Sequence, residues 1–197
     1  MKKYPTLPEG YRRLLRIDLA KNKKEFWGVH LAAVVLIALL CASMTAFVPL
    51  SALVSGEPLW VALRFAGIGV GYAVGVVLHE GIHGLFFALF SGQRPKFGLS
   101  RSFAFAGSDA YYAKIPYLWI TLSPAVVLSL LFGTLSVLSM VQVLPLSLFW
   151  VFYFLHAFHF GGAVGDFYVA LRLLFLPAQL LVKDDGTGMD VFVKEEE

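Results

Sequence analysis

The sequence has few charged residues and a single cysteine. Only 15% of its 197 residues are Asp, Glu, Lys or Arg, compared with about 25% in soluble domains. Cys41 has no second cysteine to pair with, which excludes a disulfide framework. A hydrophobic fraction of 58% and a mean hydropathy of +0.74 exclude a disordered chain. The composition therefore predicts a membrane protein, and the length favours a single domain over residues 1–197.

Charged residues are missing from three long segments, which together predict four membrane-spanning helices. A bilayer core of about 30 Å needs about 20 apolar residues of helix. No Asp, Glu, Lys or Arg lies at 26–56 or at 115–165, and Glu80 is the only one at 65–93. The segment at 115–165 is long enough for two spans. We therefore predict an all-α integral membrane protein with a polar tail at 183–197 and spans at about 27–50, 59–90, 116–140 and 144–165.

The basic residues predict the orientation of these spans. With four spans, both termini and the loop between spans two and three share one side of the membrane. Of the 16 Lys and Arg residues, all except Arg64 fall in those segments. The positive-inside rule then predicts a multi-pass protein of the cell membrane with both termini cytoplasmic. We interpret the basic N-terminus as a topology signal and a lipid-headgroup anchor, and expect no nucleic-acid partner.

A motif with metal-binding chemistry lies near the cytoplasmic end of span two. It reads His79-Glu80-Gly81-Ile82-His83. Two histidines at i and i+4 lie one helical turn apart on one face, so both imidazoles can reach one Zn²⁺. The adjacent Glu80 can then accept a proton from a zinc-activated water. The alternative is structural: two packing histidines, and a Glu80 paired with an arginine of a neighbouring helix. Glu80 is the only carboxylate of its span, where burial costs at least about 2.5 kcal/mol, and this favours a functional role.

A catalytic zinc usually has a third protein ligand. We favour Asp166, because it lies at the cytoplasmic end of span four as His79 does in span two. His159 lies about two turns earlier on the same face and is the alternative, either as a ligand or as a donor to a developing oxyanion. The remaining candidates are Asp109 in the loop, His156, which we expect to pack or line the cavity, and His30, which we expect at the interface.

These motifs resemble those of a known family. The segments His79-Glu80-Gly81-Ile82-His83-Gly84, Ser123-Pro124 and Gly165-Asp166 resemble the small membrane proteins of the "putative zincin peptidase" family, and through them the site-2 protease group of intramembrane zinc metalloproteases. The resemblance covers about residues 5–193. It implies a zinc ion held by His79, His83 and Asp166, with Glu80 as the catalytic base.

The chain departs from the site-2 protease pattern around the third ligand. Those proteases have an Asn and a Pro ahead of the ligand Asp, where this chain has Phe158 and Gly161. They also have a Gly after the Asp, where this chain has Phe167. His159 is then a candidate for the substrate-orienting role that the Asn has in those proteases. We expect no regulatory domain of the PDZ type to select substrates.

The loop at 94–116 predicts a short interfacial β-hairpin. Phe97, Leu99, Phe103 and Phe105 recur at even spacing, and Gly107-Ser108 favours a turn. An edge strand beside the metal could pair with an extended substrate by β-augmentation. An interfacial aromatic anchor is the equal alternative. After span four, we expect 167–182 to form a helix along the cytoplasmic face, followed by solvated charges at Asp184, Asp185 and Asp190.

The sequence thus predicts a zinc-dependent intramembrane endopeptidase that acts on a membrane protein or peptide substrate. A non-catalytic zinc-binding scaffold would use the same ligands, but it would not need Glu80. An ion or proton pathway through Glu80, Asp166 and His159 is a third hypothesis, and it would work without metal.

Overall fold

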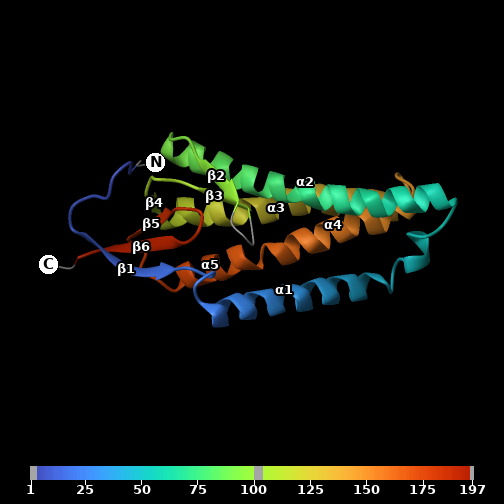
Figure 1. Cartoon of the computed structure of the whole chain (residues 1–197), viewed down its shortest axis with the longest axis horizontal. Helices are drawn as coiled ribbons and strands as arrows, with labels where there is room; N and C mark the ends of the chain where they lie inside the picture. The colour runs from blue at the N-terminus through green and yellow to red at the C-terminus, as the bar shows by residue number, and fades with distance from the viewer. Residues whose placement is uncertain (1–3, 100–103, 196–197) are drawn as a thin grey trace. The chain divides into compact units, whose positions relative to one another are not determined.

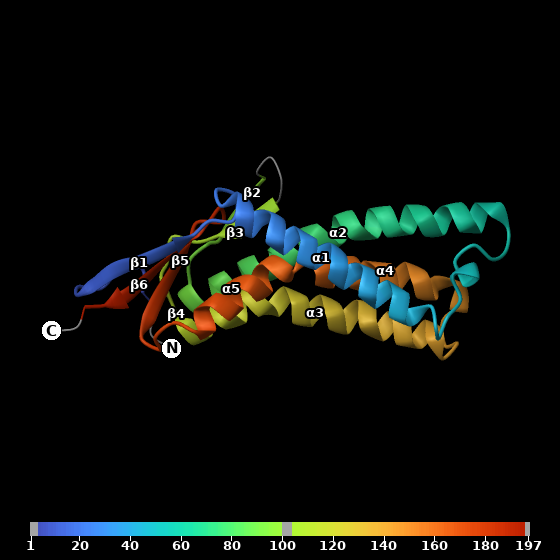
Figure 2. The same cartoon turned by 90° about the horizontal axis from the view of Figure 1, so that it is seen from below.

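The computed structural model describes residues 4–99 and 104–195. Within these ranges the chain is mostly α-helical and adds two small antiparallel sheets (Figures 1 and 2). Short 3-10 helices lie at Leu50–Ala52 and Leu146–Leu148. The α-helices are α1 (Lys23–Met44), α2 (Pro58–Ser91), α3 (Lys114–Met140), α4 (Phe149–Gly162) and α5 (Val164–Leu174).

In the described part of the chain, four helical segments are long and apolar enough to cross a membrane: α1, α2, α3 and the stretch Leu146–Leu174. The prediction of four such helices is confirmed, with two differences in their ends. The first helix ends at Met44 rather than near Leu50, since Pro49 disfavours helical geometry in the residue before it. The fourth segment continues past Gly165 to Leu174.

The chain divides into two compact units. The helical unit comprises His30–Leu78 and Ala125–Val164, and the sheet unit comprises Met1–Val29, His79–Pro124 and Gly165–Glu197. The motif His79–His83 and Asp166 both belong to the sheet unit.

In the helical unit, α4 contacts each of the other helices. Glycines permit two of these close approaches: a Cβ at Gly161 would overlap Ile37 of α1, and one at Gly71 of α2 would lie 2.8 Å from Leu155. The Tyr153 hydroxyl of α4 donates to the carbonyl oxygen of Leu40 at 3.0 Å. Small residues that bring helix backbones together are typical of membrane helix packing.

The sheet unit contains an antiparallel sheet with the strand order β1–β6–β5–β4, in which β1, β6 and β5 lie side by side (Figure 2). Its strands are β1 (Tyr11–Ile17), β4 (Tyr112–Ala113), β5 (Leu180–Asp184) and β6 (Met189–Lys194). A second sheet pairs β2 (Lys96–Leu99) with β3 (Ala104–Gly107). Buried apolar side chains join the sheet to the helix ends, among them Ile17, Phe87, Tyr112, Tyr117, Ile120, Leu173, Val182 and Val191.

These strands correct the all-α prediction. The helix expected over 167–182 ends at Leu174, and Leu180–Asp184 is a strand instead. Pro177 cannot continue a helix, and Leu180, Leu181 and Val182 are buried in the sheet unit. The tail expected at 183–197 likewise contributes β6, which pairs with β1 near the N-terminus.

The predicted hairpin between α2 and α3 is present as β2 and β3, with Phe97 opposite Ala106. The turn expected at Gly107-Ser108 does not reverse the chain within this hairpin. The backbone amide of Ser108 instead donates to the carbonyl of Asp184 at 2.7 Å, and the chain continues into β4 of the other sheet. Phe103, which the even spacing included, lies outside the described residues.

Candidate metal centre

Three side chains from α2 and α5 converge within the sheet unit. The Nε2 atoms of His79 and His83 are 3.1 Å apart. Asp166 places Oδ2 3.2 Å from Nε2 of His79 and Oδ1 3.6 Å from Nε2 of His83. All three side chains are largely buried, with 12–23% of their surface exposed. The two imidazole nitrogens and the two carboxylate oxygens of Asp166 therefore face one another.

The spacing of these donors fits zinc. Bonds of 2.0–2.1 Å in tetrahedral geometry separate the donor atoms by about 3.3 Å. The two nitrogens are 3.1 Å apart, and each lies 3.2 or 3.6 Å from one of the two oxygens of Asp166, which is close to that value. In the described part of the chain, these three residues form the group of His, Cys, Asp and Glu side chains close enough to hold a metal ion.

A backbone carbonyl fixes the ring of His83. Its Nδ1–H donates to the carbonyl oxygen of Ile120 in α3 at 2.8 Å, which leaves Nε2 as the lone-pair nitrogen facing the donor cluster. Within α3, this carbonyl would normally accept the N–H of residue 124. Pro124 has no N–H, so its position inside the helix frees the carbonyl for His83. The Ser123 hydroxyl also donates to it, at 3.1 Å.

Asp166 is placed by a break between two helices. α4 ends at Gly162, and Ala163 has non-helical geometry (ψ 3°) before α5 begins at Val164. Asp166 therefore lies in the first turn of α5, where the positive end of the helix dipole stabilises a carboxylate. The pair of glycines at 161–162 favours such an interruption.

Glu80 follows His79 in α2, and its side chain is partly buried. The backbone amide of Ala106 in β3 interacts with the Glu80 carboxylate. Since alternate amides of a strand face opposite edges, this contact orients the edge of β3 that does not pair with β2 toward Glu80. A carboxylate, a metal-ligand set and a strand edge thus lie together in one unit.

The other predicted candidates are not among the three converging residues. Asp109 is 62% exposed and forms an ion pair with Lys96 at 2.5 Å. His30 is exposed on α1, and His156 and His159 lie on α4, all three in the helical unit. Nδ1 of His156 is buried and has no hydrogen-bond partner among the described residues. The role predicted for His159 stays a prediction.

A partly buried pair between α3 and β5 was missed from the sequence. The Tyr117 hydroxyl donates to Oδ2 of Asp184 at 2.5 Å, and Tyr117 lies one turn before Ile120. Burial raises the pKa of Asp184 to about 6, against hydrogen bonds from Tyr117 and from the amide of Gly186 that favour the ionised form. The interpretation of Asp184 as a solvated charge is therefore wrong.

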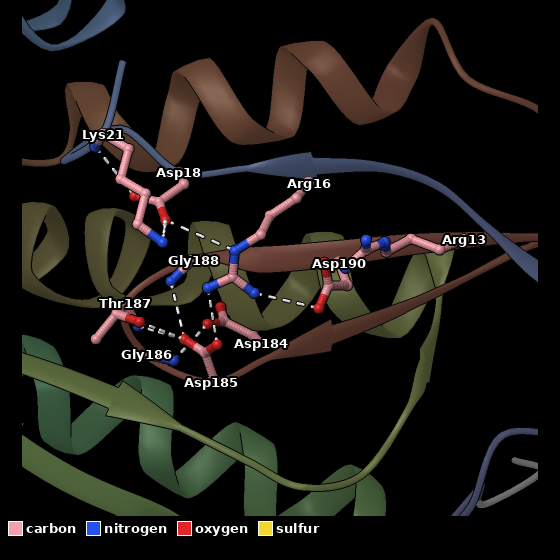
Figure 3. A network of polar contacts seen from close by, with 10 residues as sticks. All are labelled: Arg13, Arg16, Asp18, Lys21, Asp184, Asp185, Gly186, Thr187, Gly188 and Asp190. Carbon is pink, nitrogen blue, oxygen red and sulfur yellow. Dashed lines mark hydrogen bonds and ion pairs between the residues drawn. The ribbon is translucent and has the colours of Figure 1, made fainter. Parts of the chain in front are cut away.

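Asp185 is exposed, as expected of a solvated charge, with 45% of its side chain accessible, whereas Asp190 is only 20% exposed. Both form ion pairs with Arg16 of β1, at 2.9 and 3.1 Å (Figure 3). Partial burial raises the pKa of Asp185, but hydrogen bonds from Thr187 and Arg16 outweigh it and lower the value to about 2. This network joins β1 to the β5–β6 turn, and no local sequence pattern signals it.

The fold and the donor set together define a largely helical protein with a zinc-type His-His-Asp site. The model of the family described as "Putative zincin peptidase" matches residues 72–181, more than half of the chain and all of the proposed ligands. The chain belongs to this family, which indicates a zinc metallopeptidase. Neither a curated protein nor a solved structure matches the chain.

Proposed function

We propose that this protein is an intramembrane zinc endopeptidase similar to the site-2 proteases. The observation that carries the proposal is the convergence of His79, His83 and Asp166 at zinc-type separations, directly beside Glu80. Apolar helices with few buried residues support a place in the membrane: none of the hydrophobic window of α1 is buried within the chain, and only 6% of that of α2.

In this proposal the three ligand residues bind the metal and Glu80 transfers the proton. Zinc, when bound, lowers the pKa of a coordinated water toward about 7 and polarises the peptide carbonyl. His79, His83 and Asp166 would hold the metal, and the Ile120 carbonyl, which accepts from Nδ1–H of His83, orients the ring so that Nε2 faces the other ligands. Glu80 accepts the proton of the attacking water and returns it to the leaving amine. A scaffold or carrier would need the three ligands but not this carboxylate.

We further propose that β3 aligns the substrate. A peptide bond within a helix must become extended before it can be cleaved, and a free strand edge can hold it extended by backbone hydrogen bonds. The amide of Ala106 already lies at the edge that faces Glu80. A membrane protein or peptide substrate would thus lie between β3 and the metal.

The orientation also belongs to the proposal. The excess of Lys and Arg at both termini and in the loop between α2 and α3 favours a cytoplasmic location for these segments. The metal centre shares the sheet unit with all three segments. Water for hydrolysis would then reach the centre from the cytoplasm.

Glu80→Gln tests the proposed function. The purified full chain is incubated with a set of unlabelled single-span membrane peptides, and cleavage and zinc content are both measured. We expect cleavage by the wild type, an at least 100-fold lower rate in Glu80→Gln and equal zinc content in the two. The matched control Glu57→Gln lies outside the site and should cleave normally. Cleavage by Glu80→Gln at the wild-type rate would refute Glu80 as the base.

A further inference from the structure

A second polar site lies in the sheet unit, where β1 ends and α1 begins. A cavity of about 630 Å³ is lined there by the end of β1, the first turn of α1 and one side chain of α5. Its lining is strongly basic: two carboxylates, Asp18 and Glu25, are outnumbered by five cations, Arg16, Lys21, Lys23, Lys24 and Arg172. The lining therefore carries a net charge of +3.

Part of this lining is already neutralised by ion pairs within the protein. Arg16 is held by Asp185, Asp190 and Asp18 (Figure 3), and Asp185 is itself fixed by the backbone amides of Thr187 and Gly188. Lys21 pairs with Asp18 at 3.2 Å, and Arg172 pairs with Glu25 at 3.5 Å. Both carboxylates of the lining thus have cationic partners within the protein.

The remaining positive charge belongs to Lys23 and Lys24. Neither forms an ion pair within 4.0 Å in the part of the chain that the structure describes, where Asp18 and Glu25 pair with other cations. Both are exposed residues of the first turn of α1, a helix of 22 residues. The positive end of the helix dipole adds to their charge. The unpaired positive charge of this cavity is suited to binding an anion.

The surroundings indicate which anion. α1 is apolar, and one turn into it Trp27 is 68% exposed, as expected of an aromatic residue at a membrane interface. In the proposed membrane orientation, the cavity then lies at the level of the cytoplasmic headgroups. We propose that this cavity binds a phosphate group, with Lys23 and Lys24 as its ligands and Arg16 as a fixed wall. The proposal uses the membrane placement and is independent of peptide hydrolysis.

Lipid binding to the purified full chain tests this site. Native mass spectrometry and the thermal unfolding midpoint are measured in detergent with added phosphatidylglycerol, with phosphatidylcholine, or with inorganic phosphate. The variant is Lys23→Gln/Lys24→Gln. The matched control Arg12→Gln/Lys194→Gln removes the same charge from exposed positions on β1 and β6, outside the cavity. Equal helical content and equal zinc content establish that both variants are folded.

We expect phosphatidylglycerol to bind and to raise the unfolding midpoint of the wild type and the control. Its affinity for Lys23→Gln/Lys24→Gln should be about 10- to 30-fold lower, since each lysine near a headgroup contributes on the order of a fivefold factor. An equal, lysine-dependent effect of inorganic phosphate alone would support the site and assign it to a soluble phosphate. Equal weakening in both double variants, or no binding of either phosphate source, would overturn the proposal.

Discussion

The Nδ1–H of His83 in α2 donates to the carbonyl oxygen of Ile120 in α3. Ile120 lies four residues before Pro124, which is also within α3. A proline inside an apolar helix costs about 3 kcal/mol or more. Here it leaves one carbonyl without its helical partner, and that carbonyl orients a metal-ligand ring. The irregularity of α3 thus supports the centre formed by α2 and α5.

This relationship predicts the effect of Pro124→Ala. The alanine amide would compete with His83 for the Ile120 carbonyl, so zinc affinity should fall about tenfold, at the lower end for loss of a ligand's orienting partner. Zinc affinity is measured by competition with a chelator. Pro116→Ala is the control, since Pro116 lies in the first turn of α3, where no intrahelical acceptor exists. An unchanged affinity in Pro124→Ala would refute the role of the proline.

Gly84 should be required for peptide cleavage but not for zinc. A Cβ at Gly84 would overlap the far end of the Phe97 ring and crowd Pro95, so Gly84→Ala must displace this ring, by which β2 contacts α2. Because β2 carries β3, the strand edge at Glu80 would move with it. We expect an at least tenfold loss of kcat/KM with unchanged zinc content.

The control for this variant is Gly81→Ala, three residues earlier in the same helix. A Cβ there meets no atom within 4 Å, so the substitution should leave cleavage close to the wild-type rate. Equal activity of Gly84→Ala and Gly81→Ala would remove the positioning role of the Phe97 contact.

The strand-edge proposal predicts that Ala104→Pro abolishes cleavage while zinc stays bound. Ala104 and Ala106 share the edge of β3 that faces Glu80, and proline removes the amide that a substrate backbone would use. Cleavage and zinc content are measured together. Wild-type cleavage by Ala104→Pro would leave the aromatic residues of this loop as interfacial anchors.

The pKa of Asp184 predicts a pH dependence of stability. Since this pKa is raised to about 6, the folded protein binds more protons than the unfolded chain between about pH 4 and pH 6. The contribution of Asp184 to stability therefore decreases as the pH rises through that window. The groups facing it are Tyr117, the Gly186 amide, His83 and Asp185.

Asp184→Asn removes this penalty, and its amide oxygen can still accept from the Gly186 amide, while its NH2 group would donate to the Tyr117 oxygen, which reverses the direction of that hydrogen bond. At pH 7.5 it should be more stable than the wild type by about 1–3 kcal/mol, and at pH 4 the difference should vanish. Thermal unfolding in detergent at the two pH values measures the difference. Asp109→Asn, in an exposed ion pair, should have no comparable effect. Parallel pH profiles for the wild type and Asp184→Asn would contradict the assignment.

The neighbouring Asp185 should behave in the opposite way. Its pKa is lowered to about 2, so its stabilising contribution is present above about pH 4 and is lost as the pH falls toward 2. Asp185→Asn should lower the unfolding midpoint at pH 7.5, because it removes the ion pair with Arg16 and weakens the turn at Thr187. A rise in the midpoint would contradict this role.

The sequence predicted the helices and the two-histidine motif well, because both depend on local patterns. Long uncharged segments identify apolar helices, and an i, i+4 spacing fixes two side chains on one helical face. Asp166 was also predicted, since a carboxylate next to an apolar segment stands out. The geometry of the three residues agrees with that choice.

The sheet was less predictable, because its strands come from both ends of the chain. In β1 the alternation of apolar and polar residues that marks a strand is obscured by three arginines, Arg12, Arg13 and Arg16. A register shift between Arg13 and Leu15 interrupts this alternation further. The role of the Ile120 carbonyl was not predicted either, because every residue has a backbone carbonyl and the sequence does not mark the one that accepts from His83. Pro124 was the available signal, as a proline within an otherwise helical segment leaves a free carbonyl four residues earlier.

The zinc content of the purified full chain tests the central claim most directly. Wild type, Asp166→Ala and His159→Ala are purified in detergent with supplemented zinc, and bound metal is counted per chain. We predict one zinc ion per wild-type chain, its loss in Asp166→Ala and its retention in His159→Ala. No zinc in the wild type, or equal zinc in Asp166→Ala, would contradict the His79–His83–Asp166 centre.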